Sequence, residues 1–253
     1  MRFGIIAAEN GLLDAHVVAA ILEHALLPEI VLLDEKPISE RDRQLVAART
    51  AGRLPQISWD DLALPPGIVT RVPDHNGADA VTRAQAARLD WIVNAGTPRI
   101  LTVGMLDAAR HGVLNCHPGL LPAFRGSSAV EWAILLDEPV GNSVHVMTPG
   151  IDEGPILATR ATPVPPDAGY VDIRVAVYRD GFALLAQTLE GIAAGRIRPE
   201  DAAPQAAGRY FRPIDPESKA AMDRRLERSG YHGMTPLGTT PLPVTADSRP
   251  AKR

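Results

Sequence analysis

Residues 113–155 read VLNCHPGLLPAFRGSSAVEWAILLDEPVGNSVHVMTPGIDEGP and hold the most informative polar side chains of this chain. An amide and an imidazole, Asn115 and His117, stand two residues apart at the end of a β-like run. Because side chains alternate across a strand, these two project to the same side of it. Asp152 follows far later, at a separation that suits a partner carried in by a neighbouring strand.

Working outward, continuous apolar runs are typical of strands buried on both faces of a parallel sheet. Such runs lie at residues 3–8, 30–33, 68–72, 91–95 and 113–116. Helical patterns separate them, at residues 12–27, 39–52, 78–89 and 103–109. This alternation predicts an α/β fold with a Rossmann-like, mostly parallel sheet and helices on both faces.

Beyond the central stretch, the pattern indicates a helix at 127–136, strands at 143–147 and 156–162, and a Pro-rich boundary after them. A long amphipathic helix at 173–195, a strand or loop at 208–214 and a charged helix at 217–228 follow. We therefore expect an α/β domain over residues 1–165 and a small C-terminal helical extension over residues 166–232. Residues 233–253 are rich in Pro, Thr and Ser without periodicity, which predicts a disordered tail.

Composition excludes several classes of function. The net charge is −4, and no clustered Lys/Arg face is evident, so a nucleic-acid partner is not expected. The single cysteine, Cys116, excludes an intramolecular disulfide and a Cys-based zinc site. No apolar run approaches the roughly 18–20 residues of a membrane span, and no leader pattern opens the chain. These features predict a cytoplasmic protein without a membrane partner.

The central stretch resembles the catalytic domain of the folate-dependent formyltransferases, whose pattern is Asn-x-His-Pro-x-Leu-Leu-Pro-x-x-Arg-Gly and, later, Asp-x-Gly-Pro. The matching residues here are Asn115, His117, Pro118, Leu120, Leu121, Pro122, Arg125 and Gly126, then Asp152, Gly154 and Pro155. The resemblance is strong over roughly residues 90 to 160. It implies 10-formyltetrahydrofolate as co-substrate, no metal, and catalytic roles for Asn115, His117 and Asp152.

The chemistry of formyl transfer explains these residue types. The reaction passes through a tetrahedral intermediate with a developing oxyanion, which the Asn115 amide and an imidazole N–H of His117 can stabilise. The attacking ammonium must lose a proton, which Asp152 can carry through a bound water, or Asp152 can orient the imidazole. Without the motif, Asp152 would be interpreted as a turn residue, because Asp favours turns.

Two further segments are expected to contact the folate. Arg99, Ile100 and Leu101 match the family's Arg-Ile-Leu element and would offer backbone groups to the pterin ring. The later loop, with Thr148, Gly150 and Ile151, would form the opposite wall of that cleft.

Other polar residues near the motif have weaker interpretations. Arg125 and Gly126 lie beside the acceptor in the family, so Arg125 is a candidate contact for an anionic acceptor group; a solvated loop is the alternative. His145, within the predicted strand at 143–147, is interpreted as packing or support rather than as a catalytic group.

The resemblance implies that the first strand-turn-helix binds the acceptor. Residues 7–12 contain one glycine and the acidic Glu9, a poor cradle for phosphate, and residues 166–230 are too helical for a nucleic-acid-binding β-barrel. The sequence therefore favours N-formylation of a primary amine on a small acceptor, such as an amino-sugar nucleotide. The alternatives are a 10-formyltetrahydrofolate hydrolase, a glycinamide ribonucleotide formyltransferase and a non-catalytic folate-binding module. The acceptor's identity and a homodimer stay open.

Overall fold

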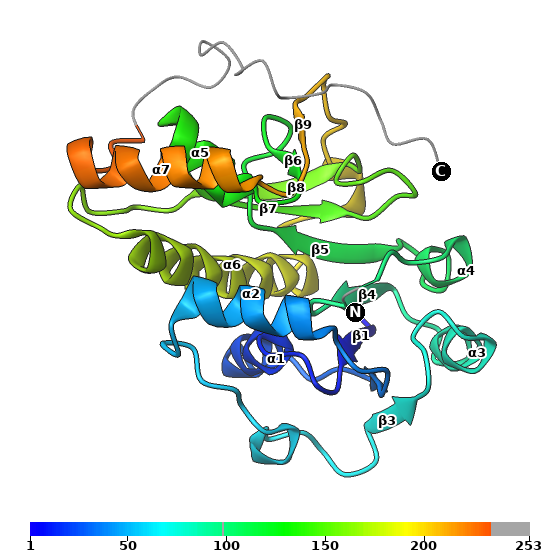
Figure 1. The fold of residues 1–253 in the computed structure, drawn as a ribbon. Coiled ribbons are helices and arrows are strands. Elements are labelled where there is room, and N and C mark those ends of the chain that lie inside the picture. Colours follow the sequence, from blue (N-terminus) through cyan, green and yellow to red (C-terminus); the bar gives the residue numbers. More distant parts are fainter. Residues whose placement is uncertain (98, 234–253) are drawn as a thin grey trace.

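A seven-stranded sheet forms the centre of the molecule in the computed structural model, which describes residues 1–97 and 99–233 (Figure 1). Its strand order is β3 (Val69–Val72), β2 (Ile30–Asp34), β1 (Phe3–Ala8), β4 (Trp91–Asn94), β5 (Val113–His117), β7 (Gly141–Val146) and β8 (Ile156–Ala161). The first five strands are parallel, whereas β7 is antiparallel to β5 and β8 to β7. The predicted α/β class with a mostly parallel sheet is confirmed.

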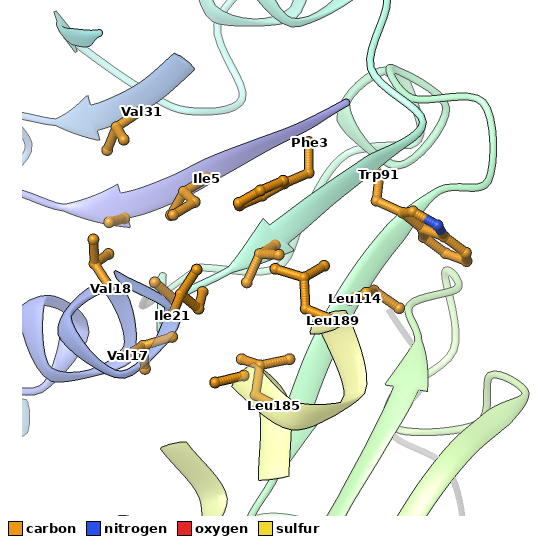
Figure 2. Packing of buried hydrophobic residues seen from close by; sticks show 14 of the residues in the cluster. Phe3, Ile5, Val17, Val18, Ile21, Val31, Trp91, Leu114, Leu185 and Leu189 are labelled. Atoms are coloured by element: carbon orange, nitrogen blue, oxygen red, sulfur yellow. The ribbon is translucent and has the colours of Figure 1, made fainter. Parts of the chain in front are cut away.

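Helices cover both faces of this sheet. They are α1 (Asp14–Glu23), α2 (Glu40–Thr50), α3 (Ala78–Ala86), α4 (Val103–Leu106), α5 (Ala129–Leu136), α6 (Tyr170–Ala193) and α7 (Pro216–Ser229). The alternation of β1 divides the core: Ile5 packs with α1 and α6, and Ile6 packs with α3 and α4. Figure 2 shows the first of these clusters, in which Val18 and Ile21 of α1 face the strands.

Helix α6 belongs to the main hydrophobic core. Leu184, Leu185 and Leu189 pack in the same cluster as residues of β1, β4 and β5. The helix therefore covers the sheet although it lies in the range expected as a C-terminal extension. The expected boundary at residue 165 stays a prediction, and residues 234–253 of the expected tail lie outside the described residues.

Local signals explain where several elements begin and end. Helix α2 begins after Ser39, whose side chain accepts a hydrogen bond from the Asp42 N–H, and α7 begins after Asp215 with proline at its first position. Helix α1 is shorter than expected and ends at Glu23, because Ala25 adopts a left-handed backbone. No helix in the described part of the chain is long and apolar enough to cross a membrane.

Three short elements were not predicted: the strand β6 (Arg125–Gly126) and the 3-10 helices η1 (Trp59–Asp61) and η2 (Pro199–Asp201). The strand β6 pairs in parallel with β9 (Tyr210–Phe211), which lies in the segment expected as a strand or loop at 208–214. Elements of two or three residues carry no periodicity, so only tertiary contacts define them. The β6–β9 pair links the central motif to a segment that follows α6.

Candidate active site

The last residue of β5, His117, is almost fully buried and faces a carboxylate from a later loop. Its Nδ1 lies 3.4 Å from Oδ2 of Asp152, and its Nε2 lies 2.7 Å from the carbonyl oxygen of Phe124. Since a carbonyl can only accept, the neutral ring carries its proton on Nε2 and turns Nδ1 toward the carboxylate. The fold thus brings together the imidazole and the distant carboxylate that the sequence pointed to.

The position of Asp152 is held by contacts at both its side chain and its backbone. The Gly126 N–H donates to Asp152 Oδ2 at 2.9 Å, and the Gln205 amide donates to the Asp152 carbonyl at 2.9 Å and to the Gly154 carbonyl at 2.6 Å. Asp152 has a φ of 52°, in the left-handed region, which Asp and Asn adopt more readily than other residues with a side chain. These contacts hold the Asp152 loop in this conformation.

Asn115 is oriented by two neighbours. Its Oδ1 accepts a hydrogen bond from Asn94 Nδ2 at 3.2 Å, and its Nδ2 lies 3.1 Å from His145 Nε2. Because His145 Nδ1 lies 3.2 Å from the Val146 carbonyl, the neutral His145 ring carries its proton there and accepts from Asn115 through Nε2. One N–H of the Asn115 amide is thereby left for another acceptor.

His145 contacts two members of this cluster, Asn115 and Asp152. The sequence indicated packing or support for this residue, and that role stays a prediction. His145 lies directly opposite Asn115 in the antiparallel register of β5 and β7, and its Nε2 is 3.6 Å from Asp152 Oδ1. Pairing the two predicted strands in this register would have identified it, since opposite residues share a face of the sheet.

Burial and neighbouring groups set the protonation of the two central residues. Burial lowers the pKa of His117, outweighing the attraction of the Asp152 charge. Burial alone would raise the pKa of Asp152, but the charge that His117 carries when protonated, a contact with His145 and the Gly126 N–H together lower it. At neutral pH the site therefore holds a neutral imidazole beside a carboxylate.

The two expected folate loops present apolar side chains to solvent. Ile100 is 72% exposed and Ile151 is 44% exposed, so both side chains are accessible to a ligand. Leu101 is buried in the core beside β4, so only its backbone can contact a ligand. In the second loop, the Thr148 hydroxyl donates to the Gly150 carbonyl at 3.4 Å.

Arg99 uses its side chain to anchor the first of these loops. Its guanidinium pairs with buried Asp34 at the end of β2 and lies 3.3 Å from Nδ1 of His75. Asp34, His75 and Asp74 have the spacing of metal ligands, but Arg99 and Lys36 pair with the two carboxylates. These cations compensate the charges of the two carboxylates. Because the Arg99 side chain is engaged there, only the backbone of residue 99 is available to contact a folate.

Arg125 and Gly126 are engaged with the segment that follows η2. The Arg125 guanidinium donates to Gln205 Oε1 at 3.0 Å and to the Ala206 carbonyl at 2.9 Å. Gly126 has a φ of 88°, and a Cβ at this position would lie 2.3 Å from the Phe211 carbonyl oxygen. The two residues support the Asp152 loop, and their expected contact with the acceptor stays a prediction.

A cavity of about 300 Å³ opens beside Asn115, between α1, α2 and α6. We call this the acceptor pocket. Its walls are mostly apolar and include Leu12, Leu13, Val17, Leu45, Val46 and Phe182; its polar lining includes Asp14, Arg49, Asn94 and Asn115. The first turn after β1 contributes to it, and the expected contact of this turn with the acceptor stays a prediction. Asn115 therefore lies between the His117–Asp152 pair and a pocket of small-molecule size.

The sequence of this chain matches a known protein family. A family model described as formyl transferase matches residues 61–189, about half of the chain. The chain belongs to the formyl transferase family. The resemblance first drawn from the motif around His117 is thereby confirmed. The matched residues include Asn115, His117, His145 and Asp152.

Among curated proteins, this chain is similar in sequence to several methionyl-tRNA formyltransferases. That of Halorhodospira halophila is 37% identical over 137 residues, which cover 53% of this chain and 44% of the relative. That of Pseudomonas paraeruginosa is 34% identical over 185 residues, which cover 68% and 59%. The chain spans about half the length of the curated relatives it matches.

Solved structures share the fold at low sequence identity. Glycinamide ribonucleotide transformylase 1 from Symbiobacterium toebii aligns with a TM-score of 0.55 and 23% identity over 85% of this chain and 94% of that one. A sugar N-formyltransferase from a Shewanella species aligns with a TM-score of 0.57 and 17% identity over 89% and 87%. These likenesses describe the architecture of this formyl transferase.

Proposed function

We propose that the protein is an N-formyltransferase that moves a formyl group from 10-formyltetrahydrofolate to a primary amine of a small acceptor. One observation carries this proposal: His117 lies 3.4 Å from Asp152, His145 contacts both Asp152 and Asn115, and Asn115 lines a pocket of about 300 Å³. Membership of the formyl transferase family supports the same chemistry. The acceptor is proposed from the pocket and the charge of the chain.

The residues around the cluster fit a folate. Exposed Ile100 and Ile151 offer apolar contact to a flat ring, and the backbone of residues 99–101 offers hydrogen-bonding groups. The Arg99–Asp34 pair keeps that backbone in place. When bound there, 10-formyltetrahydrofolate supplies the formyl carbon that the amine attacks. The proposed chemistry uses no metal.

Each member of the cluster has a role that its geometry allows. The second N–H of Asn115 donates to the formyl oxygen as negative charge develops on it, and its orientation is fixed in advance by Asn94 and His145. The bond from the amine nitrogen to the formyl carbon forms and the bond to the folate nitrogen breaks. Asp152, held ionised, takes the proton that the amine loses, and the folate nitrogen regains one proton.

His117 links this proton transfer to the protein. Its Nε2 proton is directed at the Phe124 carbonyl, so Nδ1 is the nitrogen that faces Asp152 and can share the transferred proton. We expect His117→Ala to lower kcat by about 10²–10⁴-fold, the range of a lost acid–base group, while the protein still folds. Asp79→Asn, on the exposed surface of α3, is the matched control and should leave kcat unchanged.

An aminoacyl-tRNA is the second candidate acceptor, because the relatives named above are methionyl-tRNA formyltransferases. The net charge of −4 disfavours contact with a phosphate backbone, and the pocket is small. A third outcome is hydrolysis, in which water replaces the amine at the same cluster.

One assay separates these outcomes. The protein is incubated with 10-formyltetrahydrofolate and either a panel of small amines, methionyl-tRNA or no acceptor, and tetrahydrofolate release is followed. Release that depends on a small amine supports the proposal. Release with methionyl-tRNA alone assigns the second candidate, and release without acceptor assigns the hydrolase. Bound folate without release in any arm identifies a binding module and refutes catalysis.

A further inference from the structure

Asp14 is a buried carboxyl group in the wall of the acceptor pocket. Only 4% of its surface is exposed, and its Oδ2 accepts a hydrogen bond from the Ala8 N–H at 2.7 Å. Two glycines from separate loops leave room for it: a Cβ at Gly11 would lie 2.2 Å from Oδ2, and a Cβ at Gly96 would lie 2.7 Å from Oδ1. The carboxyl thus occupies a space that side chains at these two positions would fill.

No Lys or Arg side chain in residues 1–97 and 99–233 pairs with Asp14. The other buried acidic residues in this part of the chain all have a guanidinium partner: Asp34 with Arg99, Glu131 with Arg49 and Glu138 with Arg209. Burying an unpaired charge is costly, and burial raises the pKa of Asp14 to about 7. A carboxyl left in this state beside a cavity is suited to a positive group that arrives with a ligand.

The rest of the pocket narrows the class of that ligand. Its apolar lining suits a hydrocarbon body, and Arg49 already holds Glu131, with Nε 3.0 Å from Oε1. The polar lining also includes Asp42, whose Oδ2 accepts a hydrogen bond from the Ser39 hydroxyl at 2.6 Å, and Asn115, which belongs to the proposed catalytic cluster. A phosphate near Asp14 would meet a like charge.

We propose that Asp14 binds a second, cationic nitrogen of the acceptor, so that the substrate is a diamine-like molecule with an apolar linker and no phosphate. One nitrogen reaches Asn115 and is formylated, while the other pairs with Asp14. This assignment rests on the proposed function, since it takes the pocket as the site of the formyl acceptor.

Calorimetric binding without folate tests the assignment independently of turnover. The probes are 1,6-diaminohexane, 1,6-hexanediol and 6-hydroxyhexyl phosphate, which share a chain and differ in whether an end group is cationic, neutral or anionic; diamines with shorter and longer linkers extend the series. A charge-assisted hydrogen bond to Asp14 corresponds to a preference for the diamine of about tenfold or more over the diol, with the phosphate weakest. Asp14→Asn should abolish this preference, and Asp79→Asn should retain it.

Several results would overturn it. They are an unchanged preference in Asp14→Asn, tighter binding of the phosphate than of the diamine, or no diamine affinity better than about 1 mM. The wild-type series alone decides the second and third of these, so the test does not depend on the variant's folding. If the preference holds but no amine releases tetrahydrofolate, the proposed function fails and the cation site stands. If amines are formylated and Asp14→Asn leaves the preference unchanged, the proposed function stands and the cation site fails.

Discussion

At the scale of single residues, Asp14 and Asp152 show how environment separates two carboxyl groups. Asp152 accepts a hydrogen bond from the Gly126 N–H, and its pKa is lowered, so it is ionised at neutral pH. Asp14 accepts a hydrogen bond from the Ala8 N–H but has no cationic partner among the described residues, so its charge is penalised. Under the proposed function, the first carboxylate accepts a proton and the second binds a cation.

The raised pKa of Asp14 makes stability depend on pH in a defined direction. The folded pKa of about 7 lies above the unfolded value of 3.8, so the contribution of the protonated carboxyl is fully present below pH 3.8 and is lost as pH rises through 7. We expect Asp14→Asn to raise the free energy of unfolding by up to about 4 kcal/mol at pH 8, and by much less at pH 4.5. Urea unfolding at the two pH values measures the difference, and a gain that did not depend on pH would contradict it.

At the scale of elements, the pairing of β6 with β9 supports the site. Gly126 supplies an N–H to Asp152, and its backbone approaches the Phe211 carbonyl too closely for a side chain. Gly126→Ala must accommodate a Cβ 2.3 Å from that oxygen at a φ of 88°. We expect kcat to fall at least tenfold as the loop moves, with a loss of about 1–2 kcal/mol in stability from the left-handed backbone alone.

Gly67→Ala is the matched control for this variant. Gly67 also has a positive φ, of 83°, but nothing lies within 4 Å of its Cβ position, and it is far from the cluster in sequence. Gly67→Ala should lose only about 1–2 kcal/mol, the cost of the left-handed backbone, and should keep its kcat. Equal loss of kcat in both variants would show that backbone strain, rather than displacement of Asp152, is responsible.

The same elements show what the sequence could and could not predict. Buried strands such as β1 and β5 follow from unbroken apolar runs, and the alternation rule placed Asn115 and His117 on one face. Gln205 and Ala206 could not be found this way, because they contact Asp152 and Arg125 through tertiary structure alone. The sequence did not single out Asp14 as a binding residue, because it lies in the first turn of an expected helix, where acidic residues are common.

At the scale of the whole molecule, α6 joins the C-terminal part of the chain to the sheet. Leu185 is almost fully buried in the cluster that also contains Ile5 and Val93. We expect Leu185→Ala to reduce the free energy of unfolding by about 2–5 kcal/mol, and the remaining structure to unfold in one cooperative transition. Leu27→Ala, at a position that is 56% exposed, is the control and should cost less than about 1 kcal/mol. Chemical denaturation followed by circular dichroism and tryptophan fluorescence checks both, and non-coincident curves for the two probes would argue against one unit.

Under the proposed function, the hydrogen bonds from Gln205 have a consequence for how the activities of related proteins diverge. The carbonyls of Asp152 and Gly154 are held by a side chain about fifty positions downstream, outside the residues that the family pattern matches. Turnover can therefore be retuned by substitutions in a segment that motif searches ignore. Two homologues with identical signature residues need not work at the same speed.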